Sequence, residues 1–361
     1  MTVYPYIKPR FDRLQLLMLD VVIALLPALF VGWIAFGHLL LYQVGIAVFT
    51  ALVTEFCCSW LFLGKKNTLG DGSAVVTALL LVCTLSPITP GYIVAFGAFS
   101  AILFGKIVWG GLGKNRFNPA LVGREFMGVF FASTMTSPSI WDTKTAIQTP
   151  ASNLFSALDN AFISHYFSDL VYKTSGALGE YSILCLALGG GYLLLRNRIS
   201  WHIPLALLSV FTLSAWMGTE TDLRFSMSGI VLATIFMATD MPSSPTNAKG
   251  KLYYGAMIGL LVYLFILGNV RYEYMSYSIL LLNGFSPQIS QVFQPRVWGQ
   301  TKDRKKEVET IFFLTLQILG CALAVISLYY YGWIPYLVYL YIIYTIVKFN
   351  YAYAKQVHNV I

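Results

Sequence analysis

Apolar stretches of about 18 or more residues recur along the whole chain, and they constrain the fold more than any other feature. A helix of this length crosses the hydrocarbon core of a bilayer. Composition agrees, because 57% of the 361 residues are hydrophobic and only 11% are charged, against about 25% in a typical soluble domain. The sequence therefore predicts an all-α, polytopic membrane protein.

The hydropathy pattern predicts twelve helical spans, several of them shorter than the roughly 20 residues that cross a bilayer. With a cytoplasmic N-terminus, 20 of the 24 Lys and Arg residues fall on the inside, as the positive-inside rule requires. We therefore expect both termini in the cytoplasm, and the net charge of +8 reports topology and not nucleic-acid binding. The predicted spans are 14–36, 38–62, 73–87, 91–109, 118–133, 180–196, 201–218, 227–240, 252–269, 274–291, 310–331 and 334–350.

Two stretches of the sequence, 77–103 and 233–261, repeat one pattern. Each has a short apolar helix, a Ser-Pro turn and then a helix that contains glycine. In the expected orientation the two turns face opposite sides of the membrane, so the repeat is inverted. Inverted halves with short, interrupted helices build binding sites near the membrane midplane. The alternative is a chance recurrence of Ser-Pro turns, which are common after apolar helices.

The polar segment "WGGLGKNRFNPALVGREF", residues 109–126, interrupts two apolar stretches. It does not match a nucleotide-binding P-loop, because Asn115 follows Lys114 where that motif has Ser or Thr. Asn118 and Pro119 instead predict the start of a helix, with Asn118 as the N-cap and Pro119 as the first helical residue.

The same segment predicts a place where the backbone comes close to a bound group. Gly110, Gly111 and Gly113 remove the side chains that would keep such a group away. Arg116, the backbone N–H groups after Asn118 and the helix dipole would stabilise negative charge on it. A positively charged loop that docks a cytoplasmic partner is the alternative interpretation.

The segment "GGLGKNRFNPALVG" looks like the signature of the RnfD/NqrB family, the membrane flavoprotein subunits of Rnf complexes and of sodium-translocating NADH:quinone reductases. The stretches "MLDVVIALLPAL", "SAVVTALLLVCTLSP", "MATDMPSSPTNAKGKLYYGAMIG", "SYSILLLNGFSPQI" and "QPRVWG" resemble further family segments. The resemblance covers about residues 14–299. The length and the compact loops are most like the D subunit of the Rnf complex.

This resemblance implies about ten family helices in two inverted repeats. The N-terminal repeat is expected at 1–133 and the C-terminal repeat at 180–299, with an extracytoplasmic, flavin-bearing loop at 134–179. Residues 300–361, a basic linker and two extra C-terminal spans, fall outside the resemblance. We interpret these spans as a hairpin that docks a partner, with a lipid-facing extension as the alternative.

The resemblance also implies a function. The chain is expected to relay electrons between ferredoxin and NAD, coupled to Na⁺ or H⁺ translocation across a prokaryotic cytoplasmic (inner) membrane. It is expected to act only with A, B, C, E and G type subunits, since the sequence has no dinucleotide site and no cluster ligands. A B subunit of a Na⁺-translocating quinone reductase and a secondary transporter with inverted repeats are the alternatives.

In this family FMN is attached through its phosphate to a threonine. The loop sequence "WDTKTAIQTPAS" matches the ends of the family motif at Asp142 and Thr149-Pro150, but its core differs. The resemblance implies a covalent FMN phosphoester on Thr149, with Thr145 as the substitute, or else a site that has been lost. It leaves open a second, non-covalent flavin such as riboflavin.

Acidic residues inside membrane spans are costly and are usually functional. Asp20, Glu55, Glu125 and Asp240 are such residues. We expect Asp20 and Asp240 to lie on an ion or proton path, although Asp20 could instead pair with a nearby cation. The four histidines are scattered without the spacing of metal ligands, so no metal site is expected.

Overall fold

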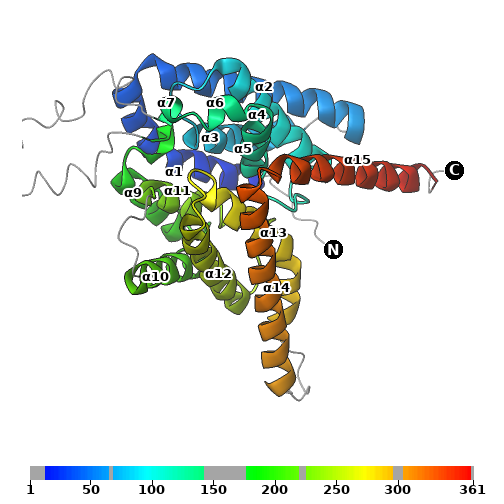
Figure 1. The fold of residues 1–361 in the computed structure, drawn as a ribbon. Coiled ribbons are helices and arrows are strands. Elements are labelled where there is room, and N and C mark those ends of the chain that lie inside the picture. The colour runs from blue at the N-terminus through cyan, green and yellow to red at the C-terminus, as the bar shows by residue number, and fades with distance from the viewer. Residues whose placement is uncertain (1–12, 65–67, 142–175, 219–224, 296–303, 359–361) are drawn as a thin grey trace, which may run out of the picture.

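The computed structural model describes residues 13–64, 68–141, 176–218, 225–295 and 304–358, and every regular element within them is a helix (Figure 1). This confirms the all-α prediction. The loop segment 142–175, which holds Thr145 and Thr149, lies outside the described residues. The α-helices are α1 (Arg13–Phe36), α2 (His38–Leu63), α3 (Ser73–Cys83), α4 (Gly91–Ile102), α5 (Pro119–Phe130), α6 (Ala132–Met135), α7 (Pro138–Trp141), α9 (Ile183–Leu195), α10 (His202–Met217), α11 (Met227–Phe236), α12 (Ala248–Leu267), α13 (Tyr274–Val292), α14 (Arg304–Tyr330) and α15 (Ile334–His358).

Helix lengths agree with a polytopic membrane protein. Four helices are long and apolar enough to cross a bilayer, namely the segments 14–36, 38–63, 248–267 and 305–330. Others are short apolar helices, among them α3 with 11 residues and α11 with 10. Both of these end earlier than the predicted spans 73–87 and 227–240, so each half contains a helix too short to cross the membrane alone.

Side-chain hydrogen bonds accompany the early end of α3. The side-chain hydroxyl of Thr84 donates to the carbonyl of Leu81. Beyond it, the amide of Gln43 on α2 donates to the carbonyls of Ser86, Pro87 and Thr89 at 2.9, 2.8 and 3.2 Å. The two N–H groups of one buried side chain therefore serve three backbone carbonyls of the Ser-Pro turn, which would be costly to leave unpaired in a membrane.

The two halves of the chain pack in the same order. In the first half α4 packs against α2 and α5, and in the second half α12 packs against α10 and α13. Across the halves α1 packs against α9, and α5 against α13. These matching pairs show that the two halves repeat the same order of helix packing, whereas the opposite orientation of the halves in the membrane stays a prediction.

Glycines allow close approach of the backbones at several of these helix contacts. A Cβ atom at Gly123 on α5 would lie 2.5 Å from the carbonyl oxygen of Gly97 on α4. A Cβ atom at Gly259 on α12 would lie 2.5 Å from the carbonyl oxygen of Leu207 on α10. Small residues at such contacts let backbones approach within a bilayer, where helix association depends on close packing.

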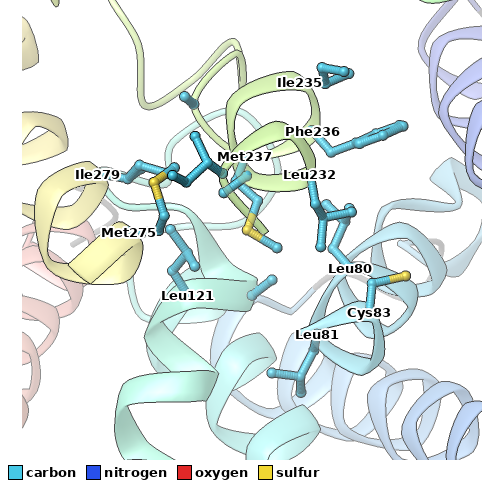
Figure 2. Packing of buried hydrophobic residues seen from close by; sticks show 14 of the residues in the cluster. Leu80, Leu81, Cys83, Leu121, Leu232, Ile235, Phe236, Met237, Met275 and Ile279 are labelled. Atoms are coloured by element: carbon cyan, nitrogen blue, oxygen red, sulfur yellow. The ribbon is translucent and has the colours of Figure 1, made fainter. Parts of the chain in front are cut away.

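The halves meet in a shared apolar core around the end of α11. Figure 2 shows Met237 between side chains of α3, α5 and α13, including Leu81, Leu121 and Met275. The ends of the short helices therefore lie inside the protein and not at its surface.

The two C-terminal helices pack on the rest of the protein in different places. Helix α14 packs against α12 and α13, and α15 packs against α5. From their connecting turn they run in clearly different directions (Figure 1), so they do not lie side by side along their length as the predicted hairpin would.

Candidate functional site

Helix α5 starts as the sequence predicts. Asn118 is its N-cap, and the Asn118 side-chain oxygen accepts from the backbone N–H groups of Ala120 and Leu121 at 3.0 and 3.4 Å. Pro119 is the first helical residue. The Asn118 amide donates to the carbonyl of Met237 at 3.2 Å. This bond ties the start of α5 to the end of α11, so Asn118 joins the two halves.

The glycine loop before α5 has a backbone that only glycine adopts easily. Gly110, Gly111 and Gly113 have φ values of 106°, 96° and 79°, in the region that disfavours residues with a side chain. Gly113 has open space around its Cα, whereas a Cβ atom at Gly110 would meet the side chain of Lys114 at 3.0 Å. Loop conformation alone therefore accounts for these glycines.

A cavity of about 180 Å³ lies where the halves meet, and we call it the inter-repeat cavity. Much of its wall is apolar and comes from α1, α3 and α11, and a group of polar side chains also lines it. Gly113 of the glycine loop lies at its edge. The polar residues used below are Ser73, Lys106, Asn115, Asn118, Arg198 and Asp240.

Asp240 is held at the wall of the inter-repeat cavity. Its Oδ2 atom accepts from the Asn115 amide at 3.3 Å and from the Ser243 hydroxyl at 2.8 Å. The structure therefore brings together three of the predicted site residues, Gly113, Asn118 and Asp240. It also pairs Asn115 with Asp240, which no pattern in the sequence predicts.

Arg116 has a different position from the one the sequence suggests. It is exposed, and its guanidinium donates to the carbonyl of Gly284 on α13 at 2.6 Å. Neither Arg116 nor Gly110 nor Gly111 lines the inter-repeat cavity. A group bound in the inter-repeat cavity would therefore contact Gly113, but not Gly110, Gly111 or Arg116.

Lys106 is a site residue that sequence reasoning missed. A π-helical turn, Leu103–Ile107, places it on the wall of the inter-repeat cavity, and such turns are frequent at functional sites. Its ammonium lies 2.5 Å from Oε1 of Glu55 and contacts the hydroxyl of Ser73. The signal was present, because a Lys inside an apolar run is itself unusual. The charge count includes Lys106 among the 20 inside cations, and in the structure its side chain is buried.

Asp20 pairs with cations of the other half. Its carboxylate accepts from Arg198 Nε at 2.6 Å and from the Tyr192 hydroxyl at 2.9 Å, and Arg196 lies 3.5 Å away. This is the pairing that the sequence left open as the alternative to an ion path. The pair also links α1 to the end of α9, and Arg198 reaches the inter-repeat cavity.

Arg124 forms a third link between the halves. It is one of the 20 cations counted on the inside, and it is buried on α5 and donates through Nε to Glu273 Oε2 at 2.9 Å. It also donates to the carbonyl of Thr84, just beyond α3, and to that of Tyr272. A guanidinium with five donors suits this position, since it satisfies a carboxylate and two carbonyls together.

Comparison with known proteins agrees with this architecture. The sequence model of the NQR2, RnfD, RnfE family matches residues 1–299. The D subunit of the Na(+)-translocating ferredoxin:NAD(+) oxidoreductase complex of Acetobacterium woodii is 37% identical over 310 residues, which covers 84% of this chain and 96% of the relative. The D subunit of the proton-translocating ferredoxin:NAD(+) oxidoreductase complex of Clostridium ljungdahlii is 34% identical over 310 residues, covering 80% and 92%.

A third relative has a broader name. The D subunit of the ion-translocating oxidoreductase complex of Halorhodospira halophila is 30% identical over 334 residues, covering 80% of this chain and 92% of the relative. The chain therefore belongs to the NQR2, RnfD, RnfE family.

Proposed function

We propose that this chain is the flavin-carrying D-type membrane subunit of an ion-translocating ferredoxin:NAD⁺ oxidoreductase complex. The observation that carries the proposal is the match to D subunits over more than nine tenths of their own length. The chain then works with the A, B, C, E and G type subunits of such a complex, which supply the dinucleotide site and the clusters that it lacks.

The coupling ion does not follow from similarity. The first two relatives named above differ little in identity, yet one is named Na⁺-translocating and the other proton-translocating. The orientation rests on the cation count, which places both termini in the cytoplasm and residues 134–179 outside. Lys106 and Arg124 are buried, and without these two the count is 18 cations inside against 4 outside.

The covalent flavin is the first cofactor in this proposal. Asp142 and Thr149-Pro150 resemble the ends of the family motif, so Thr149 is the residue proposed to carry the FMN phosphoester, with Thr145 as the substitute. A flavin carries one or two electrons, and the protein supplies its position.

The intact mass of the purified chain tests this attachment. The wild-type chain should be heavier than its sequence by one FMN less one water, and its band on a denaturing gel should fluoresce. Thr149→Ala should lose both signals, while Thr143→Ala in the same loop should keep them. Loss in Thr145→Ala alone would move the attachment to that residue. A wild-type chain without flavin would leave a secondary transporter as the better interpretation.

The inter-repeat cavity is the proposed place for a second, non-covalent flavin such as riboflavin. The donor set fits an isoalloxazine ring, because Asn115, Asn118 and Arg198 stand in a wall whose other residues are mainly apolar. The volume of about 180 Å³ is below the roughly 300–1,000 Å³ of most ligand pockets. A ring therefore fits inside only if its side chain extends past Gly113 and Leu14 toward the exposed edge.

The residues of this chain have separate roles at that cavity. Such a ring supplies reversible electron storage when bound. Asn118 and Asn115 both line the cavity. Asn118 is held in position by its bond to Met237, and Asn115 by its bond to Asp240. The positive end of the α5 dipole favours negative charge in the cavity, whereas the charge of Lys106 is balanced by Glu55. Apolar residues of α1 and α3 exclude water.

Release of non-covalent flavin tests this second site. Acid treatment of the purified chain should free a flavin that is separate from the covalent one and that survives in Thr149→Ala. Asn115→Leu should reduce its amount, whereas Gln291→Leu, at an exposed position of α13 outside the cavity lining, should not. An equal amount in both variants would place the second flavin elsewhere.

A further inference from the structure

A helix outside the family match contacts the turn that carries Lys106. Helix α15 lies beyond residue 299, where the match to the family model ends. It packs against α5 (Figure 1). Its side chains also reach the π-helical turn Leu103–Ile107 and Trp109, which follows this turn. Residues that the family model does not describe therefore contact a segment that forms part of the inter-repeat cavity.

The hydroxyl of Tyr341 on α15 bridges the π-helical turn. It donates to the carbonyl of Phe104 at 2.9 Å and accepts from Nε1 of Trp109 at 3.0 Å. Phe104 and Trp109 are five residues apart, the spacing that a backbone hydrogen bond joins in a π-helix. Val108 donates to Leu103 with this spacing, but the next bond, from Trp109 to Phe104, is absent in the described structure. The Tyr341 hydroxyl takes the place of that bond.

Two further contacts hold the same region against α15. The ammonium of Lys348 lies 3.7 Å from the ring centroid of Trp109. Lys348 follows Tyr341 by seven residues, or two helical turns, so both side chains lie on one face of α15. The Tyr341 ring also meets the ring of Phe117 edge-on, with centroids 5.7 Å apart. One face of α15 therefore holds both Trp109 and the segment that leads into α5.

The direction of the Lys106 side chain depends on this turn. Lys106 lies between Phe104 and Trp109, the two residues that the Tyr341 hydroxyl joins. A π-helical turn contains one residue more than an α-helical turn, and one residue corresponds to about 100° of rotation in an α-helix. Conversion of the turn to α-helix would therefore rotate Lys106 by up to about 100°, away from Glu55 and the inter-repeat cavity.

We propose that Tyr341 is a positioning residue, which keeps the turn Leu103–Ile107 π-helical and so holds Lys106 toward Glu55 and the inter-repeat cavity. Helix α15 then acts on the cavity without lining it, because in the described structure neither Tyr341 nor Lys348 belongs to the cavity wall. The effect on electron transfer rests on the proposed non-covalent flavin, whereas the bridge across the turn does not.

Hydrogen–deuterium exchange of the full-length chain in lipid nanodiscs tests the bridge without any flavin signal. Tyr341→Phe removes only the hydroxyl, so amide exchange in residues 103–111 should rise about fivefold, the ratio that corresponds to one neutral hydrogen bond. Tyr344→Phe is the matched control, because Tyr344 is exposed on the same helix and is not part of the bridge. It should leave exchange unchanged. Equal exchange in wild type and Tyr341→Phe would overturn the proposal.

The midpoint potential of the non-covalent flavin in the assembled complex tests the positioning role. In Tyr341→Phe the Glu55 carboxylate faces the cavity without its cation, and it opposes negative charge on the reduced flavin. The potential should therefore fall. In a background of Lys106→Met with Glu55→Leu no charge remains to be positioned, so Tyr341→Phe should cause no further fall, while exchange in 103–111 should still rise. An equal fall in both backgrounds would show a structural role only.

A measurement that needs no flavin separates this proposal from the proposed cofactor. Lys106→Met should lower the melting temperature of the chain less in the Tyr341→Phe background than in wild type, because Lys106 is already displaced from Glu55 there. Equal losses in the two backgrounds would overturn the positioning role. A wild-type chain without non-covalent flavin would instead contradict the cofactor proposal, and the two melting temperatures would still decide between the roles of Tyr341.

Discussion

The ammonium of Lys106 and the carboxylate of Glu55 lie 2.5 Å apart, with their side chains 3% and 0% exposed. Breaking such a buried pair leaves an uncompensated charge, which typically costs about 3–5 kcal/mol. We therefore expect Lys106→Met to destabilise the chain by an amount of this order. The free energy of unfolding in detergent measures it.

The double variant is the control for this pair. Lys106→Met with Glu55→Leu removes both charges and should recover much of the lost stability, since apolar replacement of a whole buried pair is often neutral. If the double variant is as unstable as the sum of both single variants, the two residues do not act as a pair.

Asp20 is expected to act mainly through its pairing with Arg198. Asp20→Asn and Arg198→Gln each weaken a charge-assisted hydrogen bond, so each should lower stability by about 1.5–3 kcal/mol. The number of ions moved per electron, measured in proteoliposomes with the assembled complex, should stay unchanged in both. A lowered ratio in Asp20→Asn alone would restore the ion path as the better interpretation.

The close contact of α4 and α5 predicts a severe effect at one glycine. A Cβ atom at Gly123 would lie 2.5 Å from the carbonyl of Gly97, so Gly123→Ala should force the helices apart and lower the thermal stability of the chain. Gly128→Ala on the same helix is the matched control, since its Cβ atom would have open space. It should be neutral or slightly stabilising, because Ala favours helix. Equal melting temperatures in the two variants would contradict the close contact.

Redox titration of the assembled complex distinguishes the roles of Asn115 and Arg116, which both precede α5. Asn115 lines the inter-repeat cavity, whereas Arg116 binds the carbonyl of Gly284 away from it. We expect Asn115→Leu to shift the midpoint potential of the non-covalent flavin and Arg116→Gln to leave every flavin potential unchanged. A shift in Arg116→Gln alone would bring back the tuning role that the sequence suggests. Loss of subunits from the complex in Arg116→Gln would favour the docking surface instead.

The proposed topology predicts a difference in labelling between two positions. In a chain without its five native cysteines, a cysteine introduced at Ser152 should react with an impermeant maleimide in intact cells. A cysteine introduced at Lys305 should react only after lysis. Equal reaction at both positions before lysis would contradict the orientation.

Local signals in the sequence predicted the helices well. The N-cap at Asn118 and the first residue Pro119 were predicted correctly because capping depends on a few neighbouring residues. The ends of α3 and α11 were placed too late, since the hydrophobic stretches continue past the last helical turn. Beyond the last helical turn, contacts from other helices hold the backbone in a turn, such as those of Gln43 on α2 with the Ser-Pro turn.

The candidate site was only partly predictable for the same physical reason. Glycine conformation and an intramembrane acid can be recognised one residue at a time, and so Gly113 and Asp240 were identified. Pairs such as Lys106 with Glu55, or Asn115 with Asp240, form only when distant helices pack. The splayed arrangement of α14 and α15 is likewise a product of packing.

The bond between Arg124 and Glu273 has a consequence for biosynthesis, because its two partners are 149 residues apart in the chain. At roughly 5–20 residues per second, a ribosome takes about 7 to 30 s to reach Glu273 after completing Arg124. During this interval Arg124 lacks its carboxylate, and of its partners only the carbonyl of Thr84 is available in the first half. The first half therefore stays incompletely assembled until the second half is inserted. A gene split within the 142–175 loop should yield a stable product only when both fragments are made in the same cell.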